Sequence, residues 1–196
     1  MSITKPFYRL WRPVKNYSPW GFMVGKQKSL ASIDYLKDER FSCQAERESL
    51  VTAAHLIILD LYDLFNYIEP HDDNFNVYSH RIYELFLRTA TEFEANCKGI
   101  LKANGYKRDY KLLNIRDYFK IASTAKLSEY QISFERWSSN HTFIPFESWK
   151  SGKSTPLPWY QSYKAVKHDR FASFKEANLK NLMNAVAGLL CMLHAQ

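Results

Sequence analysis

The stretch that decides the fold runs from residue 76 to residue 105 and reads NVYSHRIYELFLRTATEFEANCKGILKANG. Its apolar residues recur every three or four positions, the spacing that places side chains on one face of an α-helix. They are Ile82, Leu85, Phe86, Thr89, Phe93, Cys97, Ile100 and Leu101. Gly105 follows, and glycine is the residue that most often ends a helix in the left-handed conformation. The stretch therefore predicts one long amphipathic helix over residues 76–104.

Four further segments have helical signals. Apolar residues at helical spacing predict a helix over residues 42–69, with Ser42 as its N-cap. A third helix is expected to run from a cap at Asn114 to about residue 127. Another is expected to start near Pro158, because proline is tolerated in the first turn of a helix. The last helix is expected over residues 172–194.

Two stretches do not fit a helical pattern. Residues 1–40 contain several prolines and glycines that interrupt any long helix, together with many aromatic residues. In residues 128–157 apolar residues alternate in places and prolines recur, which predicts a short hairpin or an irregular loop. The expected fold is therefore mainly α: one domain over residues 1–196, with an irregular, aromatic-rich N-terminal arm (1–40) packed on a helical body (41–196). That body is a bundle of about five helices with a short β or loop insert near 128–157.

Composition limits the class of protein. Cys43, Cys97 and Cys191 are odd in number and widely spaced, which fits neither a disulfide framework nor a zinc ligand set. The N-terminal residues carry charges and prolines where a signal peptide needs an apolar core. The longest purely apolar run, residues 185–193, is too short to cross a bilayer of about 30 Å. We expect a cytoplasmic protein with no membrane association, no metal and no cofactor.

The net charge of +7 is unevenly distributed along the chain. Residues 41–97 contain ten acidic and three basic residues, a net charge of −7. Residues 98–120 and 150–180 each contain seven basic and two acidic residues, a net charge of +5 each. Basic segments attract the phosphate backbones of nucleic acids. An ordinary solvated surface, or pairing with the acidic segment within the fold or across a dimer, explains the same pattern.

The second basic segment contains the sequence WYQSYKAVKHDR, residues 159–170. On a helix Lys164 and His168 are four residues apart and share a face, with Lys167 beside them and Arg170 at or beyond the helix end. An imidazole beside cations suits a phosphate site, in which His168 and Lys164 are the candidate catalytic residues and Lys167 and Arg170 the phosphate-binding ones. The same residues also suit the commoner situation of a surface helix end whose cations complement the helix dipole.

A second polar stripe lies on the long helix. His80, Glu84 and Arg88 are spaced by four residues and therefore share one face. They either make ordinary surface pairs or lie against the helix that carries Lys164 and His168, where they would support its site.

Residues 159–170, followed by Phe174, Ala177, Asn178 and Asn181, resemble bacterial helical proteins of the HEPN type. These proteins often carry a Tyr-Asn-x-x-Lys/Arg-His helix end before a final long helix. Members that cleave RNA do so without metal, through a motif of Arg, four to six residues and His, with two copies meeting at a dimer interface. The resemblance implies that His168 activates or protonates a reacting group and that a nearby cation holds the scissile phosphate. No Arg precedes His168 at the required distance, and Lys164 is the nearest substitute.

One literal match to the family motif lies elsewhere, in RWSSNH at residues 136–141. Short motifs also occur by chance, and this one falls in the predicted non-helical insert. Three hypotheses therefore remain open. The first is an HEPN-like protein that binds or cleaves RNA as a metal-independent endoribonuclease, in a toxin or phage-defence context. The others are a non-catalytic module that homodimerises or docks a partner, and a binder of a small nucleotide-like molecule. The expected partners are RNA and a second copy of the chain.

Overall fold

The computed structural model describes residues 44–196, with side chains from residue 48 onward. Its helices are α1 (Gln44–Leu64), α2 (His80–Ala103), α3 (Ile115–Ala122), α4 (Pro158–His168), α5 (Arg170–Ser173) and α6 (Leu179–Ala195). Two short strands pair as one sheet, β1 (Ile132–Ser133) and β2 (Thr142–Phe143). Short 3₁₀ turns connect them, η4 (Asp72–Asn74), η5 (Tyr110–Leu112), η6 (Leu127–Glu129), η7 (Glu147–Trp149) and η8 (Phe174–Glu176). The predicted mainly α fold is confirmed, whereas the cap at Ser42 and the N-terminal arm (1–40) lie outside the described residues.

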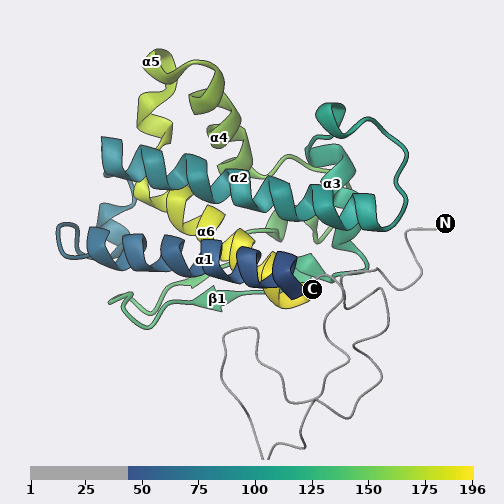
Figure 1. Cartoon of the computed structure of the whole chain (residues 1–196). Coiled ribbons are helices and arrows are strands. Elements are labelled where there is room, and N and C mark those ends of the chain that lie inside the picture. Colours follow the sequence, from purple (N-terminus) through teal and green to yellow (C-terminus); the bar gives the residue numbers. More distant parts are fainter. Residues whose placement is uncertain (1–43) are drawn as a thin grey trace, which may run out of the picture.

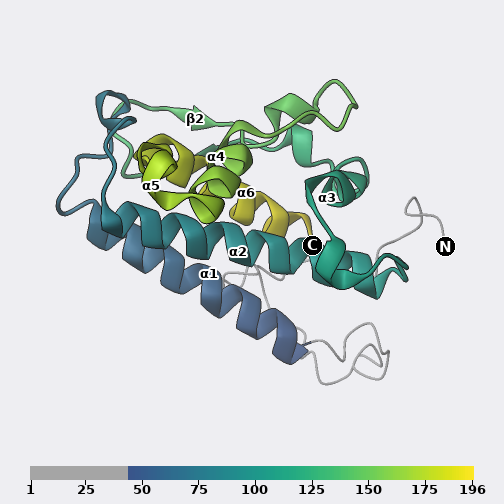
Figure 2. The same cartoon turned by 90° about the horizontal axis from the view of Figure 1, so that it is seen from above.

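Helix α2 is the centre of the bundle (Figures 1 and 2). Its predicted apolar face is buried throughout, and α1 and α6 pack against it. In both views α1 lies on one side of α2 and α4 on the other. The polar residues of α2 therefore divide between two neighbourhoods, one beside α1 and one beside α4 and α5.

The ends of α2 follow from capping residues. The Ser79 hydroxyl accepts a hydrogen bond of 3.2 Å from the backbone N–H of Ile82, and Gly105 follows the helix with a φ of +70°. The predicted start at residue 76 is wrong by four residues. Residues just before the cap are not helical, because Tyr78 pairs with Asn178 in an isolated β-bridge. The backbone of this segment therefore pairs with the residue before α6 instead of forming a helical turn.

The last predicted helix, residues 172–194, is two helices joined by a turn. Helix α5 ends at Ser173, and α6 starts after Asn178, whose side chain accepts a hydrogen bond of 3.0 Å from the N–H of Asn181. An N-cap asparagine satisfies a backbone donor that would otherwise lack a partner, so it favours a new helix start at this point. The result is a short helix, α5, that turns away from the body.

Other helix boundaries also differ from prediction. Helix α1 ends at Leu64 rather than near residue 69, because the chain turns there with a hydrogen bond of 3.0 Å from the N–H of Tyr67 to the carbonyl of Leu64. The predicted cap of α3 is confirmed, since Asn114 and Asp117 form a reciprocal capping box. The predicted end of α3 near residue 127 is wrong, because the helix ends at Ala122.

The predicted insert is a short hairpin that lies over the bundle. Strands β1 and β2 run antiparallel, with Ile132 opposite Phe143 and Ser133 opposite Thr142. The insert is anchored by buried aromatic side chains: Phe134, Trp137, Phe143, Phe146 and Trp149. These residues extend the core beyond the helices.

The insert and α4 both approach α6 closely at Gly188. A Cβ atom placed there would lie 3.1 Å from Cζ2 of Trp159 and 3.6 Å from both the Phe146 ring and the Pro145 Cβ. Trp159 also donates a hydrogen bond of 3.0 Å to the carbonyl of Pro145. The absence of a side chain at residue 188 therefore lets α4 and the insert pack directly on α6.

Two further features bear on the sequence predictions about cysteines and membrane association. Cys97 and Cys191 are buried free thiols, and burial raises the pKa of Cys191 to about 12. From residue 44 to residue 196, none of the helices combines the length and apolar character needed to cross a membrane.

Candidate functional site

The predicted cationic residues lie where α4 ends and α5 begins, at the part of the molecule that projects beyond α2 (Figure 1). We call residues 164–171 the α4–α5 tip. Pro158 starts α4, and the buried face of that helix consists of Trp159, Tyr160, Tyr163 and Val166. The opposite face is left to polar residues, which is why the four predicted site residues at the tip are all exposed.

Lys164 and His168 are one helical turn apart on α4, as predicted, and both are exposed. Within residues 48–196 neither side chain has a hydrogen bond or ion pair to another described residue. Lys167 differs, because its Nζ donates a hydrogen bond of 2.9 Å to the Tyr163 hydroxyl, and this bond raises the pKa of Lys167. The tip therefore presents one anchored cation beside one lysine and one histidine that are available to a ligand.

Arg170 stands at the first position of α5 and contacts two aromatic rings. Its guanidinium carbon lies 5.8 Å from the ring centre of Tyr83 on α2 and 5.4 Å from that of Phe171. Asp169 fixes this turn, because its carboxylate accepts a hydrogen bond of 3.0 Å from the N–H of Ala172. Sequence reasoning missed Phe171, because a single aromatic residue in a predicted helix gives no sign of whether it is buried.

Of the predicted supporting stripe, His80 contacts the segment that directly follows the tip. Its ring centre is 4.8 Å from that of Phe174, which also contacts Tyr78 and Tyr83. Phe174 belongs to η8, directly after α5. His80 therefore packs on the segment that follows the tip, and among the described residues it makes no hydrogen bond or ion pair to the tip cations.

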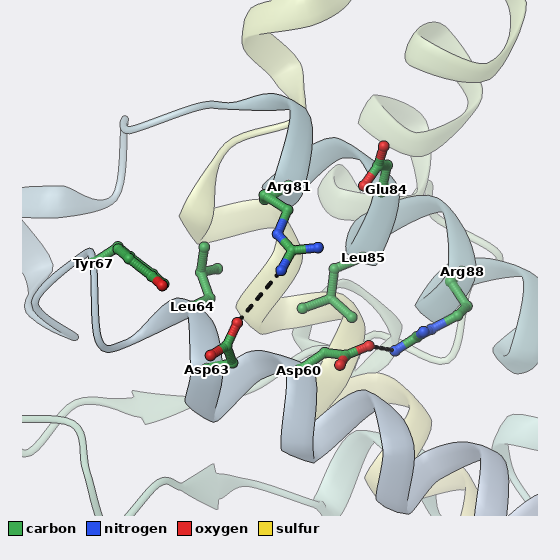
Figure 3. A pocket seen from close by; sticks show the side chains of 8 residues that line it. All are labelled: Asp60, Asp63, Leu64, Tyr67, Arg81, Glu84, Leu85 and Arg88. Carbon is green, nitrogen blue, oxygen red and sulfur yellow. Dashed lines mark hydrogen bonds and ion pairs between the residues drawn. The ribbon is translucent and has the colours of Figure 1, made fainter.

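Glu84 and Arg88 instead line a groove of about 190 Å³ between α1 and α2, shown in Figure 3. Arg88 pairs with Asp60 of α1, and Arg81 pairs with Asp63 at 3.4 Å. Arg88 thus makes an ordinary surface pair, the alternative that the sequence also allowed, on the α1 side of α2. The carboxylate that pairs with Arg88 belongs to α1, and the Arg88 side chain therefore extends toward α1.

A part-buried polar contact holds α4 on α2. The Tyr160 hydroxyl donates a hydrogen bond of 2.5 Å to Glu94, and Lys98 lies 3.7 Å from the other carboxylate oxygen. Burial and this hydrogen bond raise the pKa of Tyr160, so the hydroxyl keeps its proton. A carboxylate at this depth needs such partners, and here they fix the base of the helix that ends in the tip.

The residues of the literal RWSSNH match have separate neighbours. His141 Nδ1 lies 3.2 Å from a carboxylate oxygen of Asp72, whereas Arg136 lies 4.4 Å from the ring centre of Tyr62. Asp72 also accepts hydrogen bonds from Trp137 (2.8 Å) and Ser139 (2.7 Å). The bonds from Ser139 and Trp137 lower the pKa of Asp72. This carboxylate attaches the hairpin to the turn between α1 and α2, which sequence reasoning did not foresee.

Among the described residues, no three His, Cys, Asp or Glu side chains lie close enough together to form a metal ligand set. Comparison with known proteins gave no match to a family model, to a curated protein or to a solved structure.

Proposed function

We propose that this chain is an RNA-binding protein whose contact surface is the α4–α5 tip. The observation that carries the proposal is the exposure of Lys164, Lys167, His168 and Arg170 at the projecting end of α4 and the start of α5. The resemblance to HEPN proteins and the basic segment at residues 150–180 support the same partner. The expected cytoplasmic location, which rests on the cysteine pattern, is compatible with that role.

The physical basis is the attraction between these cations and phosphate groups. Binding to a phosphate backbone releases condensed counterions, so the affinity decreases as salt increases, with a logarithmic slope of about 0.7 per phosphate contacted on a single strand. Lys167 is held in place by Tyr163 and Arg170 by Tyr83, which reduces the entropy lost on binding. Lys164 and His168 have no competing carboxylate partner among the described residues.

The proposal extends to RNA cleavage through the resemblance. His168 would transfer a proton, Lys164 would hold the scissile phosphate, and Lys167 and Arg170 would bind flanking phosphates, without a metal. In one protomer the candidate catalytic residues are exposed to solvent. Because HEPN nucleases pair their motifs across two copies, cleavage by this chain would require a dimer.

The binding proposal is tested by charge reversal at the tip. The triple variant Lys164→Glu, Lys167→Glu, Arg170→Glu should weaken binding of an unstructured RNA by at least about tenfold at about 0.1 M salt, and should lower the salt slope by about 2. Fluorescence anisotropy over a salt series measures both. The fold should remain intact because all three residues are exposed.

A matched variant distinguishes an effect of charge reversal at the tip from an effect of the overall net charge. Lys102→Glu, Lys107→Glu, Lys111→Glu changes the charge by the same amount on exposed residues near the far end of α2 (Figure 1). Equal losses for both triples would show that only total charge matters and would reject the tip as the contact surface. A wild-type protein without RNA affinity would reject the proposal itself. If the protein cuts RNA, His168→Ala should abolish cutting, and an unchanged rate would exclude His168 as a catalytic residue.

A second copy of the chain is the second proposed partner, and it is favoured by the outer face of α1. Leu56 is 52% exposed and Leu59 is 49% exposed, three residues apart on one helix face. The Asp60–Arg88 and Asp63–Arg81 pairs lie nearby, so the apolar face has a polar border. An apolar centre with a polar rim is the usual composition of an interface.

The double variant Leu56→Glu, Leu59→Glu should convert a dimer into a monomer, because four charges would face one another across a two-fold axis. Light scattering after size-exclusion chromatography gives the molar mass. The control is Tyr110→Glu, Leu112→Glu, which places the same charges on side chains that are 49% and 60% exposed elsewhere. A monomeric wild-type protein, or a dimer that survives the α1 variant, would exclude this interface.

A further inference from the structure

Phe171 is the most exposed of the large hydrophobic side chains that the structure describes, at 91%. Burying a phenylalanine ring stabilises a fold, and Phe171, which is exposed, contributes almost none of this stabilisation. The ring lies within the cationic tip, directly after Arg170. Its position therefore calls for an explanation other than folding.

The segment around Phe171 is held by packing contacts, although the ring itself is exposed to solvent. Phe174, three residues further on, packs among Tyr78, His80 and Tyr83 of the region around the start of α2. Arg170 extends over both Tyr83 and Phe171. The ring is thus presented on a fixed support, and only a modest part of the binding energy would be lost in ordering it.

We propose that Phe171 stacks on an unpaired base, so that the α4–α5 tip recognises single-stranded RNA in preference to duplex RNA; this inference rests on the proposed function. An aromatic ring can stack on the face of any base that is not already stacked in a helix. The cations of the tip hold the phosphates of the same strand, and Arg170, whose guanidinium lies 5.4 Å from the ring centre, contacts ring and backbone together.

Charge favours a nucleic acid over an apolar protein surface as the occupant. Lys164, Lys167 and Arg170 precede Phe171 within the tip, and Asp169 is occupied in capping α5. A protein partner that buried the ring would also have to desolvate these cations, which is costly unless carboxylates face them. A single RNA strand offers phosphates to the cations and an unstacked base to the Phe171 ring at the same time.

The test measures the affinity of wild type, Phe171→Ala and Phe171→Trp for an unstructured oligouridylate, a duplex of equal length, and the same strand with abasic sites. Phe171→Ala should weaken oligouridylate binding by about 5- to 100-fold with an unchanged salt slope, because stacking is lost and charge is kept. Phe171→Trp should bind at least as well as wild type. Abasic RNA and duplex RNA should bind weakly to all three proteins.

The matched control is Tyr67→Ala, which removes an aromatic ring that is 80% exposed beside Asp63 and outside the tip. It should leave RNA affinity unchanged. Equal binding of strand and duplex, with no effect of Phe171→Ala, would overturn the stacking role and leave the proposed RNA binding intact. No binding to any RNA would overturn both. A loss of self-association in Phe171→Ala without a change in RNA affinity would assign the ring to a protein contact and also overturn the inference.

Discussion

Replacing Phe93 with alanine is expected to lower the free energy of unfolding by about 3–5 kcal/mol, the range for removing a phenylalanine from a well-packed core. Phe93 has no exposed surface. Its ring centre lies 5.2 Å from that of Trp159, 5.9 Å from Phe146 and 6.3 Å from Tyr118. The residue therefore joins α2 to α4, to the insert and to α3, and no single neighbour can move to fill the space. Thermal unfolding followed by circular dichroism should show a decrease in melting temperature of roughly 10 °C.

The control for this prediction is the same substitution at Phe171. That ring is 91% exposed, so Phe171→Ala should change stability by less than about 0.5 kcal/mol. The pair compares one chemical change at two extremes of burial. A loss below about 1 kcal/mol for Phe93→Ala would contradict the packing described for the aromatic core.

Replacing Gly188 with valine should also destabilise the fold, by about 2–3 kcal/mol, through overpacking rather than a cavity. A Cβ at residue 188 would already lie 3.1 Å from Trp159, and the valine methyl groups would extend further into the same space. Trp159 cannot rotate away freely, because its ring nitrogen donates to the Pro145 carbonyl. Urea denaturation gives the change in free energy, and tryptophan fluorescence should report the displaced ring.

Two comparisons isolate the steric cause at residue 188. Ala95→Val places a β-branched residue on an exposed position of α2 and should cost less than about 0.7 kcal/mol, the range of ordinary helix propensities. Gly188→Ala should lie between the two, since the gain in helix propensity of about 1 kcal/mol opposes the close contact. If Gly188→Val and Ala95→Val are equally stable, α6 does not approach Trp159 as closely as described.

The helices were largely predictable because their signals are local. The apolar spacing of α2, the asparagine cap of α3 and the proline start of α4 are each contained in a few neighbouring residues. The errors at the start of α2 and of α6 arose where a distant segment decides the outcome. Asn178 caps the start of α6 and pairs with Tyr78, which lies one hundred positions earlier in the chain. No local pattern contains that pairing.

The candidate site was also predictable only where local helical geometry decides the outcome. That Lys164 and His168 share a face follows from helical geometry alone. The position of Arg88 does not, because it depends on which neighbouring helix supplies a carboxylate, and Asp60 of α1 does so. Phe171 and Phe174 are both aromatic residues near one helix end, yet one is exposed and the other packs on α2. Only the three-dimensional arrangement separates them.

The carboxylate of Asp72 has a consequence for strand register. It accepts from Trp137 and Ser139 and lies beside His141, which are alternate residues along the hairpin. These residues lie in the loop that joins β1 and β2, so a slip of one strand against the other would have to shift this loop and break its hydrogen bonds to Asp72. Strands of only two residues each hold their alignment weakly by themselves. A single acidic side chain on a distant turn thus selects one alignment of the hairpin over its neighbours.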